Sequence, residues 1–96
     1  MDSKDRAALR RAANGMKTVY YIGKEPIGDN LIEGIRQALK ARELIKVGVQ
    51  DASEVSARQA AEEIARALDA QVIQVIGSRF VLYRRNPEID AYRIKS

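Results

Sequence analysis

Cysteine, histidine and tryptophan are all absent from this chain of 96 residues. Without cysteine there is no disulfide and no thiolate ligand for a metal, so the fold must depend on packing alone. Without histidine the chain lacks the commonest general base and the commonest metal ligand of proteins. We therefore expect a protein that is not an enzyme and that holds neither a metal nor a cofactor.

Long hydrophobic runs are missing as well. None approaches the roughly 18 residues of a membrane-spanning helix, and the first residues, MDSKDRAALRR, lack the apolar core of a signal peptide. This predicts a cytoplasmic protein with no membrane partner. Hydrophobic residues still make up 46% of the chain, which suits one small domain. We expect its core within about residues 3–86 and a tail over 87–96.

Basic residues exceed acidic ones only modestly, with 17 Lys and Arg against 13 Asp and Glu and a net charge of +4. An excess of this size is common, so the distribution of charges is more informative than their sum. A helix is predicted over residues 3–16, where Leu9, Ala12, Ala13 and Met16 share one face. Its basic residues include Arg10, and Lys17 follows directly.

The most informative segment joins a strand over 19–22 to a helix over about 29–42 through Gly23, Lys24 and Gly28. A flexible backbone, a cation and the positive end of a helix dipole together suit a phosphate. On the outer face of this helix Arg36 and Lys40 lie four residues apart. They are either solvated charges or a continuation of the phosphate-binding surface that begins at Lys24. The predicted phosphate-binding residues are Gly23, Lys24 and Gly28, extended by Lys17, Arg10, Arg36 and Lys40.

The remaining elements alternate regularly. We expect strands over 44–49, 71–76 and 79–83, and a helix that begins after Ser53 or Ser56 and runs to Leu68. Gly77 and Ser78 form a two-residue turn of the type II′ kind between the last two strands. The order α-β-α-β-α-β-β predicts an α/β fold with a four-stranded mixed sheet packed with helices. The last residues show little periodicity and predict an extended or frayed end.

Two catalytic interpretations fail on spacing. A P-loop needs Gly, four residues and then Gly-Lys-Ser/Thr, whereas here Lys24 follows the first glycine of its loop. Glu62 and Glu63 are adjacent on a helix, so their carboxylates diverge and cannot act as a pair. Nucleic-acid binding is therefore favoured over catalysis.

Aromatic side chains are few, with four Tyr and one Phe. Tyr20 and Tyr21 are neighbours on a strand, so alternation sends them to opposite faces, and one of them could stack on a base. Packing in the core or at an edge is the favoured role for each.

Three segments together resemble the signature blocks of the CRM domain, named for chloroplast RNA splicing and ribosome maturation, in its single-domain YhbY-like form: YIGKEPIGDNLIEGI, ARELIKVGV and AQVIQVIGSRFVLYRR. The resemblance spans about residues 3–86. It implies a fold similar to the C-terminal domain of bacterial translation initiation factor three. It also implies RNA binding, with ribosomal RNA of large-subunit precursors as the partner, and a role in ribosome assembly. Apart from the resemblance, we also expect ribosomal proteins as partners.

One position departs from the family pattern. The family loop reads Gly-x-x-Gly, and here Pro26 stands in place of the second glycine. Proline offers no backbone N–H to a phosphate, so either Gly28 substitutes for the missing glycine or Lys24 and the helix terminus provide most of the affinity. The competing hypothesis is a protein-interaction module that docks on a ribosomal protein or another factor, with RNA affinity incidental.

Overall fold

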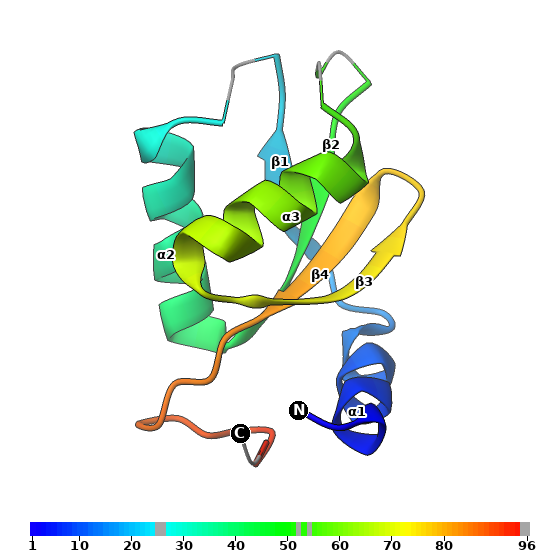
Figure 1. Ribbon diagram of the computed structural model, residues 1–96, viewed down its shortest axis with the longest axis vertical. Coiled ribbons are helices and arrows are strands. Elements are labelled where there is room, and N and C mark those ends of the chain that lie inside the picture. Colours follow the sequence, from blue (N-terminus) through cyan, green and yellow to red (C-terminus); the bar gives the residue numbers. More distant parts are fainter. Residues whose placement is uncertain (25–26, 52, 54, 95–96) are drawn as a thin grey trace.

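The computed structural model describes residues 1–24, 27–51, 53 and 55–94. The predicted order of elements is confirmed (Figure 1): α1 (Ser3–Ala13), β1 (Thr18–Ile22), α2 (Asp29–Arg42), β2 (Leu44–Val49), α3 (Ala57–Leu68), β3 (Gln71–Ile76) and β4 (Arg79–Tyr83). In this described part of the chain no helix is long and apolar enough to cross a membrane.

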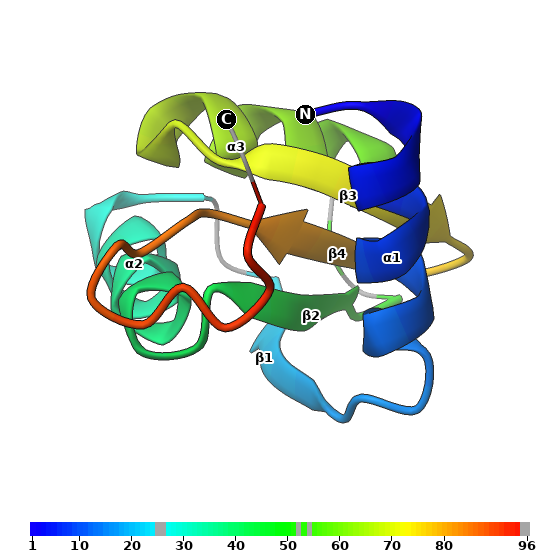
Figure 2. The same cartoon turned by 90° about the horizontal axis from the view of Figure 1, so that it is seen from below.

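The four strands form one mixed sheet in the order β1-β2-β4-β3 (Figure 2). The β1 and β2 strands are parallel, as expected for strands joined through a helix, while β4 is antiparallel to both β2 and β3. Between β3 and β4 the chain turns at Gly77, which has a φ of +56° that glycine adopts without strain. The mixed sheet and the predicted hairpin are therefore both confirmed.

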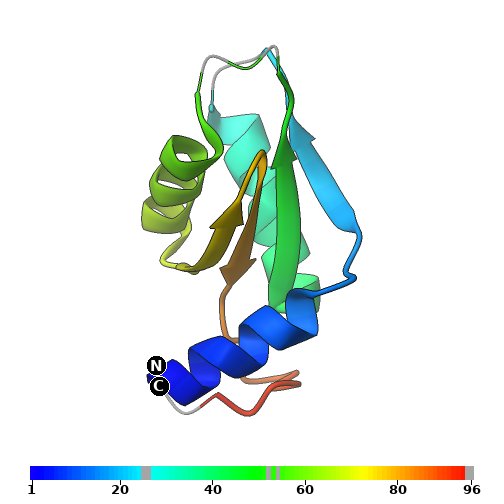
Figure 3. The ribbon, with the colours of Figure 1, turned by 90° about the vertical axis from the view of Figure 1, so that its right-hand side faces the viewer.

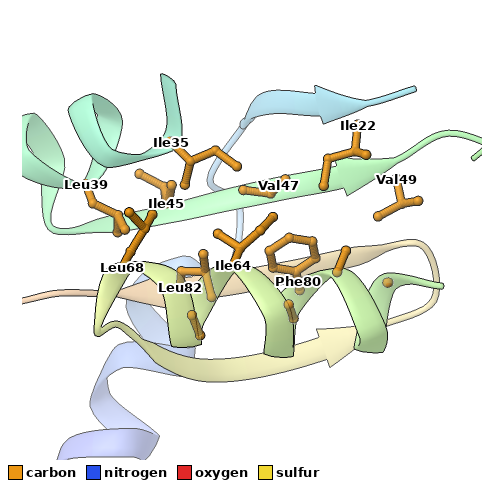
Figure 4. Packing of buried hydrophobic residues seen from close by; sticks show 14 residues of the cluster. Ile22, Ile35, Leu39, Ile45, Val47, Val49, Ile64, Leu68, Phe80 and Leu82 are labelled. Carbon is orange, nitrogen blue, oxygen red and sulfur yellow. The ribbon is translucent and has the colours of Figure 1, made fainter. Parts of the chain in front are cut away.

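The main core lies between the sheet and the helices α2 and α3 (Figure 4). Alternate residues of β2 and β4 point into it, among them Val47 and Phe80, and meet Ile35 of α2 and Ile64 of α3. The α3 helix starts at a complete capping box, in which Ser56 and Gln59 exchange hydrogen bonds. Of the two predicted caps, Ser56 is therefore the one used.

On the opposite face of the sheet, the described part of the chain covers one end and leaves the other open. At the covered end α1 crosses the foot of the strands (Figure 3) and the C-terminal segment lies beside it. Arg6 of α1 donates from Nη2 to the carbonyl oxygen of Val72 at 2.6 Å, which ties the helix to β3. The buried residues of this second cluster are Leu9, Ala13, Leu44, Ile73, Val81, Tyr83 and Ile94.

Two expectations about the ends of the chain are wrong. The first helix ends at Ala13 instead of residue 16, because the chain reverses at Gly15 with a φ of +81°, and Ala12 is exposed instead of buried. The C-terminal segment is not frayed over its described residues, because Ile94 is buried in the second cluster. A single buried residue in a segment without periodic hydrophobic positions gives no signal in the sequence. The packing of Ile94 could therefore not be predicted.

Candidate nucleic-acid interface

Gly23 and Lys24 begin the connection from β1 to Gly28 at the start of α2, which we call the Gly-Lys loop. It leaves the sheet at the end opposite α1 (Figure 1). The last residue of β1, Ile22, accepts a hydrogen bond through its carbonyl from the N–H of Gln50 at 2.8 Å, so the ends of β1 and β2 are held together. At Gly23 an added Cβ would lie 3.1 Å from Oε1 of Gln50, a close but adjustable contact. Lys24 follows with its side chain exposed. A cation therefore comes directly after the end of β1, which is held in place by β2.

The N-terminus of α2 faces this loop without a side-chain cap. Gly28 is the N-cap residue and provides only backbone, in contrast to Asp2 of α1 and Ser56 of α3, whose side chains each accept a backbone N–H. The first N–H groups of a helix have no partner within the helix, so those of α2 can be offered to an anion. The exposed Asp29 in this first turn reduces the local positive potential. Gly23, Lys24 and Gly28 thus flank one loop, as predicted; Pro26 lies outside the described residues.

The basic residues of α2 lie toward its other end. A helix rises about 1.5 Å per residue, so Lys40 is roughly 16 Å along the axis from Asp29. There Arg36 and Lys40 line a hollow of about 400 Å³ with Arg84 and Arg85. The hollow is mixed in charge, since Glu88 also lines it. The structure therefore separates these two predicted residues from the Gly-Lys loop, and it groups them with cations that follow β4.

A carboxylate on α2 engages one of these cations. Glu33 accepts from Gln37 Nε2 at 2.7 Å and from Arg36 Nε at 3.1 Å. The hydrogen bond from Gln37, helped by the Arg36 guanidinium, lowers the pKa of Glu33 below its ordinary value. Glu33 is therefore anionic at neutral pH and offsets part of the positive charge beside the hollow.

Arg10 and Lys17 occupy a third location. Arg10 is in the last turn of α1, and Lys17 lies between α1 and β1 at the foot of the sheet. The five residues of β1 separate Lys17 from Gly23, a distance of roughly 20 Å at the rise of an extended strand. Both side chains are exposed, but neither lies beside the loop.

The predicted phosphate-binding residues include neither Lys46 nor Arg79. Both belong to strands of the sheet, and the four strands contain no Asp or Glu. Assigning strand residues to faces by alternation would have placed both cations on the face opposite α2 and α3. Among the described residues no cluster of acidic side chains could hold a metal ion.

The geometry can be set beside known proteins. Residues 1–84 match the family model of the CRS1/YhbY (CRM) domain. The chain is 35% identical over 88 residues to "Probable RNA-binding protein YqeI" of Bacillus subtilis, covering 92% of each chain. It is 34% identical over 86 residues to a protein of Methanocaldococcus jannaschii that is also named a probable RNA-binding protein, covering 88% of this chain and 63% of that one.

A solved structure agrees with the fold. The solution structure of a hypothetical protein of Staphylococcus aureus, proposed to bind RNA, superposes with a TM-score of 0.71 at 34% identity and covers 90% of each chain. The match of the family model over residues 1–84 and the identities above 30% lead to one assignment. The chain belongs to the CRS1/YhbY (CRM) domain family.

Proposed function

We propose that this protein binds RNA, and that its RNA is ribosomal, in precursors of the large ribosomal subunit, where it acts as an assembly factor. The names of its relatives support RNA binding in general. The ribosomal role is proposed because single-domain members of the family are associated with precursors of the large ribosomal subunit.

The observation that carries the proposal is the junction of β1 with α2. Lys24 has an exposed side chain, and Gly28, the N-cap residue of the helix that follows, provides no competing side chain. A phosphate placed there receives backbone N–H groups from the helix and charge from the lysine. Gly23 keeps the backbone at the end of β1 uncrowded by a side chain of its own, so the ribose-phosphate chain can approach closely.

The test is affinity for ribosomal RNA fragments as a function of salt concentration. Binding through several phosphates weakens steeply as salt rises, whereas a mainly apolar protein interface does not. We expect affinity in the micromolar range or tighter at about 50 mM salt, with little sequence preference. Absence of binding at that salt concentration would contradict the proposal and favour the protein-interaction module, whose natural surface is the mixed-charge outer side of α3.

The location of the site is tested by matched charge removals. Lys24→Ala should cost on the order of 1 kcal/mol of binding free energy and lower the salt slope by about one ion. Arg66→Ala removes the same charge from α3, near Glu62 and Glu63, and should change little. Lys95→Ala removes a charge outside the described residues and serves as a second control. Equal losses for all three variants would indicate diffuse charge instead of a site at the loop.

A further inference from the structure

Among the described residues, no helix covers one part of the sheet. One row of residues crosses all four strands where α1 does not reach: Tyr21 pairs with Gly48, Gly48 with Arg79, and Arg79 with Ile76. Figure 3 shows the strands continuing above α1 toward the loops. We call this surface the open face, and its residues are Thr18, Tyr21, Lys46, Gly48, Ile76 and Arg79.

The ring of Tyr21 lies against the backbone of β2. A Cβ added at Gly48 would come within 3.0 Å of both Cδ1 and Cε1 of Tyr21 and within 3.3 Å of Cγ2 of Thr18. The glycine therefore leaves the space that the ring occupies. The side chain of Tyr21 remains 53% exposed, whereas Tyr20 packs against the main core. The open face thus presents an aromatic ring that is supported from below by the neighbouring strand.

A cation is held beside this ring. Arg79 donates from Nε to Oγ1 of Thr18 at 3.0 Å, which spans β2 and links β4 to β1. This bond uses one of the five N–H donors of the guanidinium. Lys46, which pairs with Thr18 in the register of β1 and β2, adds a second cation on the same face. Both cations therefore lie on the same face of the sheet as Tyr21.

The charge of the open face selects a class of ligand. The four strands include no acidic residue, and both of their cations lie on this face. An exposed ring beside two cations suits a single-stranded nucleic acid, whose bases stack on aromatic side chains while its phosphates meet the cations. A duplex does not suit it, because the faces of its bases are already stacked.

We propose that the open face binds a single-stranded segment of RNA, with one unpaired base stacked on Tyr21 and the adjoining phosphates at Lys46 and Arg79. Tyr21 is two residues before Gly23, so this surface continues directly from the Gly-Lys loop. The inference rests on the RNA binding proposed above and adds to it a preference for unpaired bases.

The experiment compares Tyr21→Phe with Tyr21→Leu, because phenylalanine keeps the flat ring and leucine keeps only apolar bulk. The probes are a short single-stranded RNA that carries one 2-aminopurine and a duplex of the same sequence. We expect Tyr21→Leu to lower affinity for the single strand by about 5- to 150-fold, the range found for loss of one stacked base, and to leave duplex affinity within about twofold. Tyr21→Phe should bind both as the native protein does.

Controls separate the open face from the loop and from folding. Val19→Ala removes another exposed apolar side chain from β1 and should leave the affinity unchanged. Binding of the single strand to the native protein should quench 2-aminopurine fluorescence through stacking, a readout that needs no variant to fold. Equal losses of Tyr21→Leu for duplex and single strand, or absence of quenching, would overturn the proposal.

The outcomes also distinguish this inference from the proposed function. If Lys24→Ala weakens binding while Tyr21→Leu binds the single strand normally, the loop site stands and the open face serves something other than RNA, such as a protein. If the native protein binds neither probe at low salt, both proposals fail together.

Discussion

The carboxylate of Glu43 accepts a hydrogen bond from the backbone N–H of Ala91 at 2.9 Å. The other carboxylate oxygen accepts from the N–H of Asn86 at 2.8 Å. The backbone carbonyl of Glu43 accepts from the N–H of Arg84 at 2.9 Å. The side chain is completely buried, at the C-terminal end of α2. One acidic residue therefore fixes the path of the chain after β4, including Asn86, which lines the hollow beside α2.

Glu43→Ala should destabilise the protein by about 3 kcal/mol, because it leaves two backbone N–H groups without their charged acceptor. Glu43→Gln should cost roughly half as much, since the amide offers one acceptor oxygen and turns an NH₂ group toward the other donor. Urea unfolding measures both free energies, and amide hydrogen exchange at Asn86 and Ala91 should accelerate in each variant. Unchanged exchange at these two amides would show that the carboxylate does not hold the segment.

A glycine in α2 is required by the ring of Tyr20. A Cβ at Gly34 would lie 2.8 Å from the hydroxyl oxygen of Tyr20 and 2.9 Å from its Cε2. Alanine is the better helix former by about 1 kcal/mol, but displacing a packed ring costs about 1–3 kcal/mol. Gly34→Ala should therefore destabilise the native protein yet stabilise the Tyr20→Ala variant. A double-mutant cycle of unfolding free energies measures this reversal of sign; additive effects would contradict it.

Much of the fold follows from local signals in the sequence. Val and Ile mark the strands, Gly77 marks the hairpin, and Ser56 with Gln59 marks the start of α3. Such signals lie within a few residues of the feature that they predict, so they can be interpreted without knowledge of tertiary contacts.

The candidate site was only partly predictable for the same reason. The Gly23–Lys24 junction is local, whereas the separation of Lys40 from that loop depends on the length and direction of α2. From the sequence Glu43 is expected on the surface, because the backbone N–H groups that donate to its carboxylate come near it only after β4 has returned to the same end of the sheet. The support that Gly48 gives to Tyr21 requires the register of two strands, which alternation alone does not provide.

Tyr83 predicts a loss of stability at alkaline pH. Its hydroxyl is buried and makes no hydrogen bond to any described residue. Burial, with the nearby carboxylates of Glu43 and Asp90, raises the pKa of Tyr83 to about 12. The unfolded chain releases this proton near pH 10, so the folded state is favoured below that pH and the free energy of unfolding falls between about pH 10 and 12.

Tyr83→Phe should remove this part of the alkaline loss. At pH 7 it should leave stability unchanged or raise it by up to about 1 kcal/mol, because the buried hydroxyl has no described partner. Urea unfolding at pH 7 and pH 11 provides the comparison, with Tyr21→Phe as the control at an exposed tyrosine. A clear loss of stability at pH 7 would mean that the hydroxyl has a partner after all.

The last prediction tests whether the outer face of α2 contacts RNA. Glu33 lies 3.1 Å from Nε of Arg36 and is held anionic by Gln37 and Arg36. If Arg36 and Lys40 meet phosphates, Glu33→Gln should strengthen RNA binding by about two- to fivefold at low salt, the size expected when one exposed charge interaction changes. Glu62→Gln makes the same change in net charge on α3 and is the matched control. The measurement is affinity against salt concentration for a ribosomal RNA fragment, and an equal gain from both variants would show that only net charge matters.

Arg36→Ala with Lys40→Ala should then produce the opposite change, with circular dichroism confirming the fold, if the hollow at the end of α2 belongs to the same interface as Lys24.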